Sequence, residues 1–229
     1  MEKGKVISAL IGANGSGKTT LFDIISGFLE PDGGDIFFEG KSIVRMPPYK
    51  IAQLGISRTF QYTRIFPQLT ALENVMLAGN YPLGKSFWYS IFRRRSVKKE
   101  EVEARERALK WLDFVGLEGK KNSLTGDLSY GQKKLVELSI ALMADAPFLL
   151  LDEPLSGVYP GLVEKIMNLL ISLKEDFGKT IFFIEHNLKA TREISDWIIF
   201  IDEGKKIVEG RPEEVFKNED VLKRYWGLK

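Results

Sequence analysis

Eight residues near the start of the chain have the types and the spacing that hold a phosphate chain. They fit the pattern G-x-x-x-x-G-K-[ST] of a phosphate-binding P-loop. Gly15 and Gly17 lack a Cβ, so the backbone can turn tightly and point successive N–H groups at an anion. Lys18 supplies a positive charge for the β- and γ-phosphates, and Thr19 supplies a hydroxyl for Mg²⁺. The residues predicted to bind a nucleoside triphosphate are Gly12, Ala13, Asn14, Gly15, Ser16, Gly17, Lys18, Thr19 and Thr20.

Polar side chains also follow three other predicted strands. Gln61, the pair Asp152 and Glu153, and His186 each come at the carboxyl end of a predicted strand. Ligands of open α/β sheets sit beyond these strand ends, so we expect the side chains to converge with the P-loop on one triphosphate. Asp152 and Gln61, together with Thr19, are suited to binding Mg²⁺ through oxygen. Glu153 is suited to deprotonating the attacking water, and Gln61 to binding that water. A lone histidine is usually structural, but the place of His186 beside these residues favours a catalytic role.

Apolar runs alternate with helical patterns along much of the chain. Strands are predicted at 6–11, 35–40, 56–60, 148–151 and 180–184, and a hairpin at 197–208. Helices are predicted after the P-loop, after Pro47-Pro48, from Pro160 to a stop at Gly178, and from Pro212. Strands that alternate with helices indicate a mostly parallel, layered α/β core with antiparallel additions.

The middle of the chain has a different character. Residues 62–130 look mostly helical, which predicts a helical subdomain inserted into a core of about 1–61 and 131–229, all within one domain. Thr70 and Glu73 have the spacing of a capping box, so a helix is predicted to start there. Residues 79–100 combine crowded aromatics with Arg93-Arg94-Arg95. This insertion can contact a membrane surface or a partner chain, or its aromatics can fold back on the domain.

Composition excludes several classes of protein. With 229 residues, of which 44% are hydrophobic, the chain can bury a substantial core. A net charge of +2 gives no global field for nucleic acid, and the absence of cysteine excludes disulfides and thiolate metal sites. No apolar run reaches the length that spans a bilayer. We therefore expect a cytoplasmic protein, with any membrane part supplied by another chain.

Taken in order, the motifs resemble those of the ABC ATPases. They correspond to Walker A (12–19), the Q-loop (Gln61), the signature (128–132), Walker B (151–154) and the switch histidine (His186), and the likeness covers almost the whole chain. The stretches 20–27, 56–61, 72–75 and 184–187 are similar to those of ATP-binding subunits of branched-chain amino-acid (Liv-type) importers. Close relatives of that group import urea.

The resemblance implies an ATPase that uses ATP and Mg²⁺ to drive amino-acid uptake, with branched-chain substrates expected and urea or amides as the alternative. It also implies a head-to-tail dimer with the same or a related chain, in which Ser129, Gly131 and Gln132 of one subunit complete the γ-phosphate site of the other. An ordinary helix cap fits this stretch equally well. Further implied partners are integral-membrane permease subunits and, indirectly, a periplasmic-type solute-binding protein. No nucleic acid is implied, and the ATPase would lie on the inner face of the cell membrane.

Three features depart from the family pattern. Tyr130 stands where the commonest signature has Gly, and Tyr159 stands where the D-loop usually has Asp or Asn. Two upstream strands and an adenine-stacking aromatic are expected to be missing, because Met1 lies so close to the P-loop; either the chain starts late or another residue takes the adenine. Two other classes stay open: a non-transport ABC ATPase of DNA repair or translation, and a nucleotide-binding interaction module with little hydrolysis.

Overall fold

The computed structural model describes residues 5–59, 65–79 and 94–226, and it divides them into two compact units. Unit 1 comprises 5–59 and 146–226, and unit 2 comprises 65–79 and 94–145. Gln61 and most of the aromatic and basic insertion lie outside the described residues.

Unit 1 is built on a six-stranded sheet with the spatial order β4-β5-β6-β1-β7-β8. Neighbouring strands are parallel except β7 and β8, which form the predicted antiparallel hairpin. The inner strands are continuous apolar runs because helices cover both faces of a parallel sheet. The strands are β1 (Ile7–Ile11), β4 (Ile56–Arg58), β5 (Phe148–Asp152), β6 (Thr180–Ile184), β7 (Trp197–Asp202) and β8 (Lys205–Gly210).

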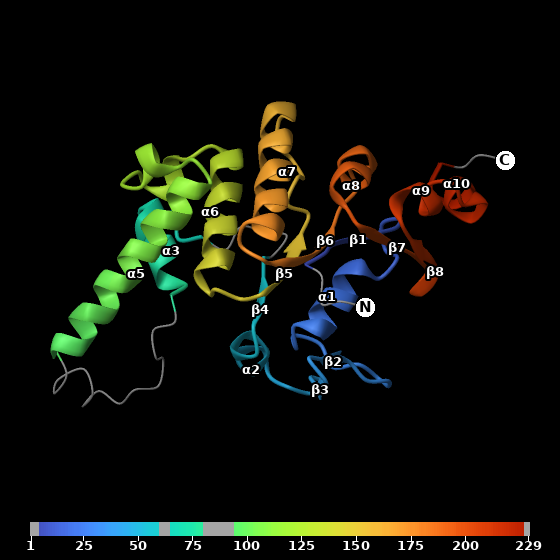
Figure 1. The fold of residues 1–229 in the computed structure, drawn as a ribbon, viewed down its shortest axis with the longest axis horizontal. Helices are drawn as coiled ribbons and strands as arrows, with labels where there is room; N and C mark the ends of the chain where they lie inside the picture. Colours follow the sequence, from blue (N-terminus) through green and yellow to red (C-terminus); the bar gives the residue numbers. More distant parts are fainter. Residues whose placement is uncertain (1–4, 60–64, 80–93, 227–229) are drawn as a thin grey trace. The chain divides into compact units, whose positions relative to one another are not determined.

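Helices lie on both faces of this sheet. Figure 1 shows α7 and α8 on one face and α1 on the other. Successive strand side chains point to opposite faces, and one set packs with α1 and α2. That core joins Leu10, Leu150 and Phe182 to Phe22, whose ring centroid lies 5.2 Å from that of Phe182. The helices of unit 1 are α1 (Lys18–Ile25), α2 (Pro48–Gln53), α7 (Pro160–Glu175), α8 (Leu188–Ile194), α9 (Pro212–Val215) and α10 (Glu219–Trp226).

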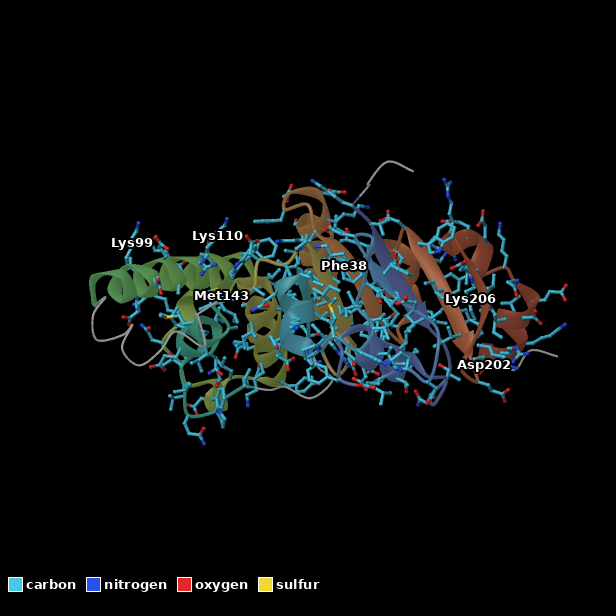
Figure 2. All side chains as sticks on the ribbon, turned by 90° about the horizontal axis from the view of Figure 1, so that it is seen from below. Phe38, Lys99, Lys110, Met143, Asp202 and Lys206 are labelled. Atoms are coloured by element: carbon cyan, nitrogen blue, oxygen red, sulfur yellow. The ribbon has the colours of Figure 1, made fainter. Side chains whose placement is uncertain are left out.

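The strand predicted over residues 35–40 is wrong in its extent. Only β2 (Phe37–Phe38) is extended there, and it pairs with β3 (Lys41–Ser42) in a small separate hairpin. Glu39 and Gly40 both have positive φ, 49° and 78°, which reverses the chain at the point where the pattern continued the strand. Figure 2 labels Phe38, whose ring lies 5.8 Å from that of Phe148 on β5.

Unit 2 is helical. Its helices are α3 (Ala71–Leu77), α5 (Arg94–Phe114) and α6 (Tyr130–Met143), with short 3₁₀ turns at Glu118–Lys120 and Thr125–Asp127. The capping box predicted at Thr70 and Glu73 is confirmed, because each residue binds the backbone of the other. Lys99 and Lys110 lie on the exposed side of α5 (Figure 2). Residues from 131 were assigned to the core, but α6 belongs to unit 2 because its apolar side packs on α3 and α5. Among the described residues, no helix has both the length and the apolar character required to cross a membrane.

Candidate active site

The P-loop connects the end of β1 to the start of α1. Gly15 and Gly17 have φ of 79° and 97°, in the left-handed region that other residues rarely adopt, and Gly17 is the N-cap of α1. Gly12 is required for a different reason. A Cβ at Gly12 would lie 2.1 Å from the carbonyl oxygen of Ile201, so the loop rests directly on β7. The loop is further held by Gly204, whose N–H donates to the carbonyl of Ser16 at 3.1 Å.

Lys18 folds back over the loop that precedes it. Its ammonium donates to the carbonyls of Gly12 and Ala13 at 3.0 and 2.8 Å. The residue is only 6% exposed, and this burial lowers the pKa of Lys18, while the charges of Glu153 and Asp152 act in the opposite direction. The structure therefore brings the P-loop lysine into the field of both predicted catalytic and metal-binding carboxylates.

Asp152 ends β5 as a buried carboxylate, 2% exposed. Neither of its side-chain oxygens has a hydrogen-bond partner within the described residues. Its nearest cation is Arg58 on β4, whose guanidinium lies 3.5 Å away and also donates to Asp23 and Ser26 of the α1 segment, at 2.7 Å each. Burial raises the pKa of Asp152, and Arg58 opposes this shift. The carboxylate, whose Oδ2 is in an ion pair with Arg58, therefore has oxygens that can bind a further cation.

Arg58 was not among the residues assigned to the site from the sequence. The available signal was a charge inside an apolar strand, at a position that the alternation of side chains places near the P-loop helix. A buried guanidinium is stable only with partners, and the partners found here are residues of α1 and β5.

Glu153 and His186 meet at the ends of two neighbouring strands. The imidazole Nε2 lies 3.1 Å from Glu153 Oε1. Glu153 has φ of 49°, and its N–H donates to the carbonyl of Ile184 at 3.0 Å. A left-handed glutamate is uncommon and costs free energy, so the surrounding structure holds this side chain in place. The pair can orient and deprotonate a water, which is a chemistry that neither residue performs as well alone.

Glu185 was also missed by sequence reasoning. It is 2% exposed, and it accepts hydrogen bonds from the N–H groups of Leu155, His186 and Asn187, at 2.6, 3.0 and 3.4 Å. Burial raises the pKa of Glu185, and the three N–H donors act against this shift. The available signal was a glutamate directly after a strand whose last four residues are apolar, because such a group needs buried donors.

The remaining predicted residues are placed as follows. Thr19 and Thr20 are exposed in the first turn of α1, and Tyr159 is 69% exposed at the N-cap of α7. In unit 2, Ser129 caps α6: its hydroxyl accepts from the N–H of Gln132 at 3.3 Å, and Gln132 accepts from the N–H of Ser129 at 2.9 Å. These side chains and their backbone groups form a reciprocal capping box of the kind found at ordinary helix starts.

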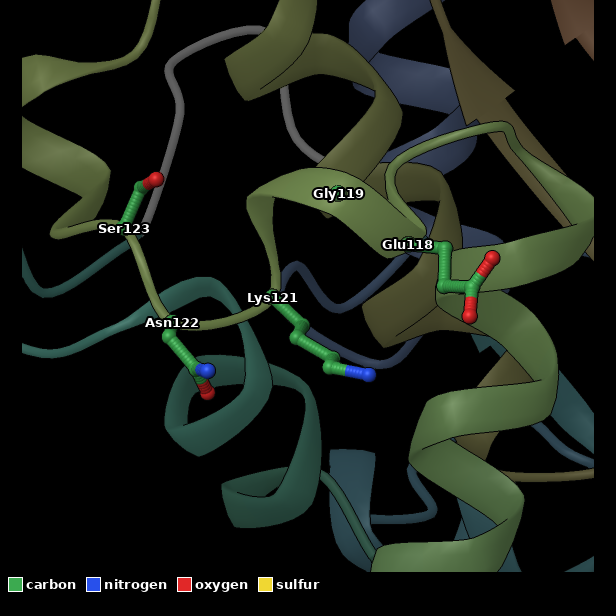
Figure 3. Close-up of a pocket in the computed structure, with 5 residues that line it drawn as sticks. All are labelled: Glu118, Gly119, Lys121, Asn122 and Ser123. Carbon is green, nitrogen blue, oxygen red and sulfur yellow. The ribbon is translucent and has the colours of Figure 1, made fainter.

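Unit 2 also has a pocket of about 480 Å³, shown in Figure 3. It is lined by Glu118, Gly119, Lys121, Asn122 and Ser123, and none of the predicted site residues is among them. Within the described residues, no group of three acidic, histidine or cysteine side chains forms a metal cluster.

Comparison with known proteins gives a consistent result. The sequence profile of the ABC transporter family matches residues 1–156. The chain is 37% identical over 227 residues to the high-affinity branched-chain amino acid transport ATP-binding protein BraF of Pseudomonas aeruginosa, with coverage of 99% of this chain and 89% of BraF. A solved ADP conformation of an ATP-binding cassette of an ABC transporter matches with a TM-score of 0.82 and 37% identity, over 97% of this chain and 88% of that chain. A dimeric, post-hydrolysis cassette bound to ADP and Pi matches with a TM-score of 0.75 and 29% identity, over 93% of this chain and 87% of that chain.

The predicted fold class is confirmed by these structures, which share the α/β core of a P-loop ATPase. The family match spans more than half of the chain, and the relatives are covered over most of their own length. The chain belongs to the ABC transporter family, as a subunit that binds and hydrolyses ATP.

Proposed function

We propose that this ATPase drives the import of amino acids, with branched-chain amino acids as the transported class. The name of BraF and the four stretches that resemble Liv-type subunits support this assignment. We propose permease subunits in the membrane as direct partners, with a solute-binding protein acting through them. The ATPase would then be peripheral, on the inner face of the cell membrane.

The single observation that carries the mechanism is the 3.1 Å contact between Glu153 and His186. It lies beside a P-loop whose Lys18 interacts electrostatically with both Glu153 and Asp152. Residues 12–20 would hold the triphosphate through backbone N–H groups, the helix N-terminus and Lys18. Glu153 would accept a proton from the attacking water, and His186 would hold the carboxylate in the orientation for that step. Gln61, which lies outside the described residues, is proposed to bind the same water.

The donor set fits a Mg²⁺ ion. The two buried oxygens of Asp152 have no hydrogen-bond partner within the described residues, and carboxylate oxygens are preferred ligands of this cation. Asp152, Thr19 and Gln61 are proposed to hold it. When bound, Mg²⁺ would neutralise negative charge that develops on the phosphate oxygens.

We propose that the two units form one ABC ATPase domain and that two such domains pair head to tail. The solved dimeric cassette supports pairing as a mode of assembly for this fold. In the dimer, Ser129, Gly131 and Gln132 would present a helix N-terminus to the γ-phosphate held by the partner. The hydroxyl of Ser129 already accepts from its own helix, so the contact would rely on its O–H and on backbone N–H groups.

Replacement of the proposed general base tests this mechanism. Glu153→Gln should leave ATP affinity intact and slow phosphate release by ~10²-fold or more, the usual scale for a general base. The variant should also accumulate as an ATP-bound dimer in size-exclusion chromatography. Glu164→Gln, an exposed glutamate on α7, is the matched control and should behave as the wild type. Unchanged turnover in Glu153→Gln would remove Glu153 from this role.

The substrate class needs a transport experiment. Proteoliposomes that contain the chain together with the permease subunits encoded beside it should take up labelled leucine when ATP is inside and the matching binding protein is outside. Uptake of urea without uptake of leucine would replace the amino-acid assignment by the amide one. The Glu153→Gln variant should abolish uptake of either solute.

A further inference from the structure

One buried carboxylate next to the active site takes no part in the mechanism above. Glu185 follows the last residue of β6 and is 2% exposed, and its hydrogen bonds within the described residues come from backbone N–H groups. Both of its oxygens are used: Oε1 accepts from the N–H of Leu155 at 2.6 Å, and Oε2 accepts from the N–H of His186 at 3.0 Å. The N–H of Asn187 adds a longer contact of 3.4 Å to Oε2.

These bonds join two segments that are far apart in sequence. Leu155 lies two residues after Glu153, and its N–H is separated from Glu185 by 30 positions along the chain. His186 follows Glu185 directly. The Glu185 side chain therefore binds the backbone of two segments: the one that carries Glu153, and the one that carries His186. The imidazole Nε2 of His186 lies 3.1 Å from Oε1 of Glu153.

The carboxylate of Glu185 is well suited to binding two backbone segments at once. A carboxylate that accepts several backbone N–H bonds is stabilised in its charged form, and such charge-assisted bonds are shorter and stronger than neutral ones. The N–H of Leu155, a buried residue, has Glu185 as its acceptor, and a buried N–H without an acceptor is costly. A threonine or an alanine at this position could not reach both segments, because a single oxygen, or none, would replace two.

The left-handed backbone of Glu153 makes such a restraint necessary. At φ of 49° the residue is in a conformation that a glutamate leaves readily unless the chain on either side is held. On one side β5 holds it through the sheet, and its own N–H binds Ile184. On the other side, the N–H of Ser156 donates to the carbonyl of Glu153 at 3.2 Å, and the N–H of Leu155 ties this segment to Glu185 on the neighbouring strand end.

We propose that Glu185 is a positioning residue for ATP hydrolysis, which fixes the distance between Glu153 and His186 by binding the backbone of both segments. The inference rests on the proposed roles of Glu153 and His186. Glu185 does not touch the reacting atoms, and the P-loop is held by other contacts. Its loss therefore lowers the rate of hydrolysis and leaves the affinity for ATP unchanged.

The first test separates rate from binding. Glu185→Ala is expected to lower kcat by roughly 10–10²-fold, the range that a displacement of about 1 Å produces in a catalytic group. The Kd for ATP should stay within twofold of the wild type. Glu185→Gln keeps one acceptor oxygen and should recover part of the loss, and it serves in place of Glu185→Ala if that variant does not fold. Glu164→Gln is again the matched control.

The second test observes the pair directly. His186 is the only histidine of the chain, so the Hε1 proton of its ring gives a single assignable NMR signal in protein free of a histidine tag. In Glu185→Gln or Glu185→Ala this signal should move in the same direction as in Glu153→Gln, because all three changes disturb the contact at the ring. A signal that stays at its wild-type position would overturn the proposal.

A double variant completes the argument. If Glu185 acts by positioning Glu153 against His186, then Glu185→Gln combined with Glu153→Gln should be no slower than Glu153→Gln alone, since residues of one unit are not additive. Additive losses, or a loss of ATP affinity equal to the loss of kcat, would show a merely structural role. If Glu153→Gln has a lowered kcat and Glu185→Gln has the wild-type kcat, only this inference is refuted. If Glu153→Gln keeps the wild-type kcat, the proposed mechanism itself is refuted.

Discussion

Removal of the buried cation at Arg58 should destabilise the protein through one carboxylate. Arg58→Met keeps much of the side-chain volume and deletes the charge. Asp23 is 37% exposed and can be hydrated, and Ser26 retains its bond to the carbonyl of Phe22. Asp152 has neither option, because it is 2% exposed and its oxygens have no hydrogen bond within the described residues. The cost of the substitution therefore falls mainly on Asp152.

The magnitude follows from the geometry. At 3.5 Å, an effective dielectric constant of about 20 gives an attraction of about 5 kcal/mol between Arg58 and Asp152. Breaking a buried pair by removal of one partner costs about 3–5 kcal/mol. Lys18 also interacts with Asp152, so the lower end of about 3 kcal/mol is expected. For a chain of this size that corresponds to a fall in Tm of roughly 6–12 °C.

The assay is denaturant unfolding of the nucleotide-free protein, with the midpoint compared at constant m-value. Arg58→Met combined with Asp152→Asn replaces the pair by neutral groups. It should recover about 2 kcal/mol of the stability lost in Arg58→Met, as expected for residues in contact. Effects of the two substitutions that add within about 0.5 kcal/mol would refute the reasoning, because they would show that Asp152 is not the group that Arg58 stabilises.

Three further outcomes are expected. Lys18→Ala should weaken ATP binding in equilibrium titration, and retained affinity would contradict the P-loop assignment. Gly12→Ala should abolish ATP binding or folding, because the new Cβ would lie 2.1 Å from the carbonyl oxygen of Ile201. The control is Gly119→Ala, whose new Cβ would have no atom within 4 Å, and it should resemble the wild type in Tm and turnover. Asp152→Asn should raise the Tm of the nucleotide-free protein at pH 7. Because the folded-state pKa of Asp152 is raised, the wild type gains stability as pH falls through that pKa towards the ordinary value of 3.8. The advantage of the variant should therefore shrink as pH is lowered through this range, and a constant difference would contradict the burial of charge.

Elements with strong local signals were predicted well from the sequence. The continuous apolar runs of β5 and β6 and the capping box at Thr70 are present where the patterns placed them. Pro160 begins α7, as a proline in the first turn indicates. The strand over 35–40 failed because alternation of side chains says nothing about where a chain reverses, and two left-handed residues decide that point.

The active-site residues likewise fall into those that a local sequence pattern identifies and those that it does not. The P-loop, Asp152, Glu153 and His186 are recognisable because each follows an apolar strand and has a side chain suited to phosphate or water. Arg58 and Glu185 are not, since their roles depend on partners 35 and 30 residues away, and no local pattern specifies such partners. The sequence identifies residues suited to binding a ligand more readily than residues that position other side chains.

The position of β1 in the sheet has a consequence for synthesis of the chain on the ribosome. Among the strands of this sheet β1 is made first, yet its neighbours are β6 and β7, which are the third-last and second-last strands to be made. Gly12 rests on Ile201, and Ser16 accepts from Gly204, so the loop is complete only after these residues have left the exit tunnel. Pairings between the two ends of a chain form late because the intervening loop must first be closed. A nascent chain that stops before residue 204 should therefore emerge with its phosphate-binding motif intact in sequence and unable to retain ATP.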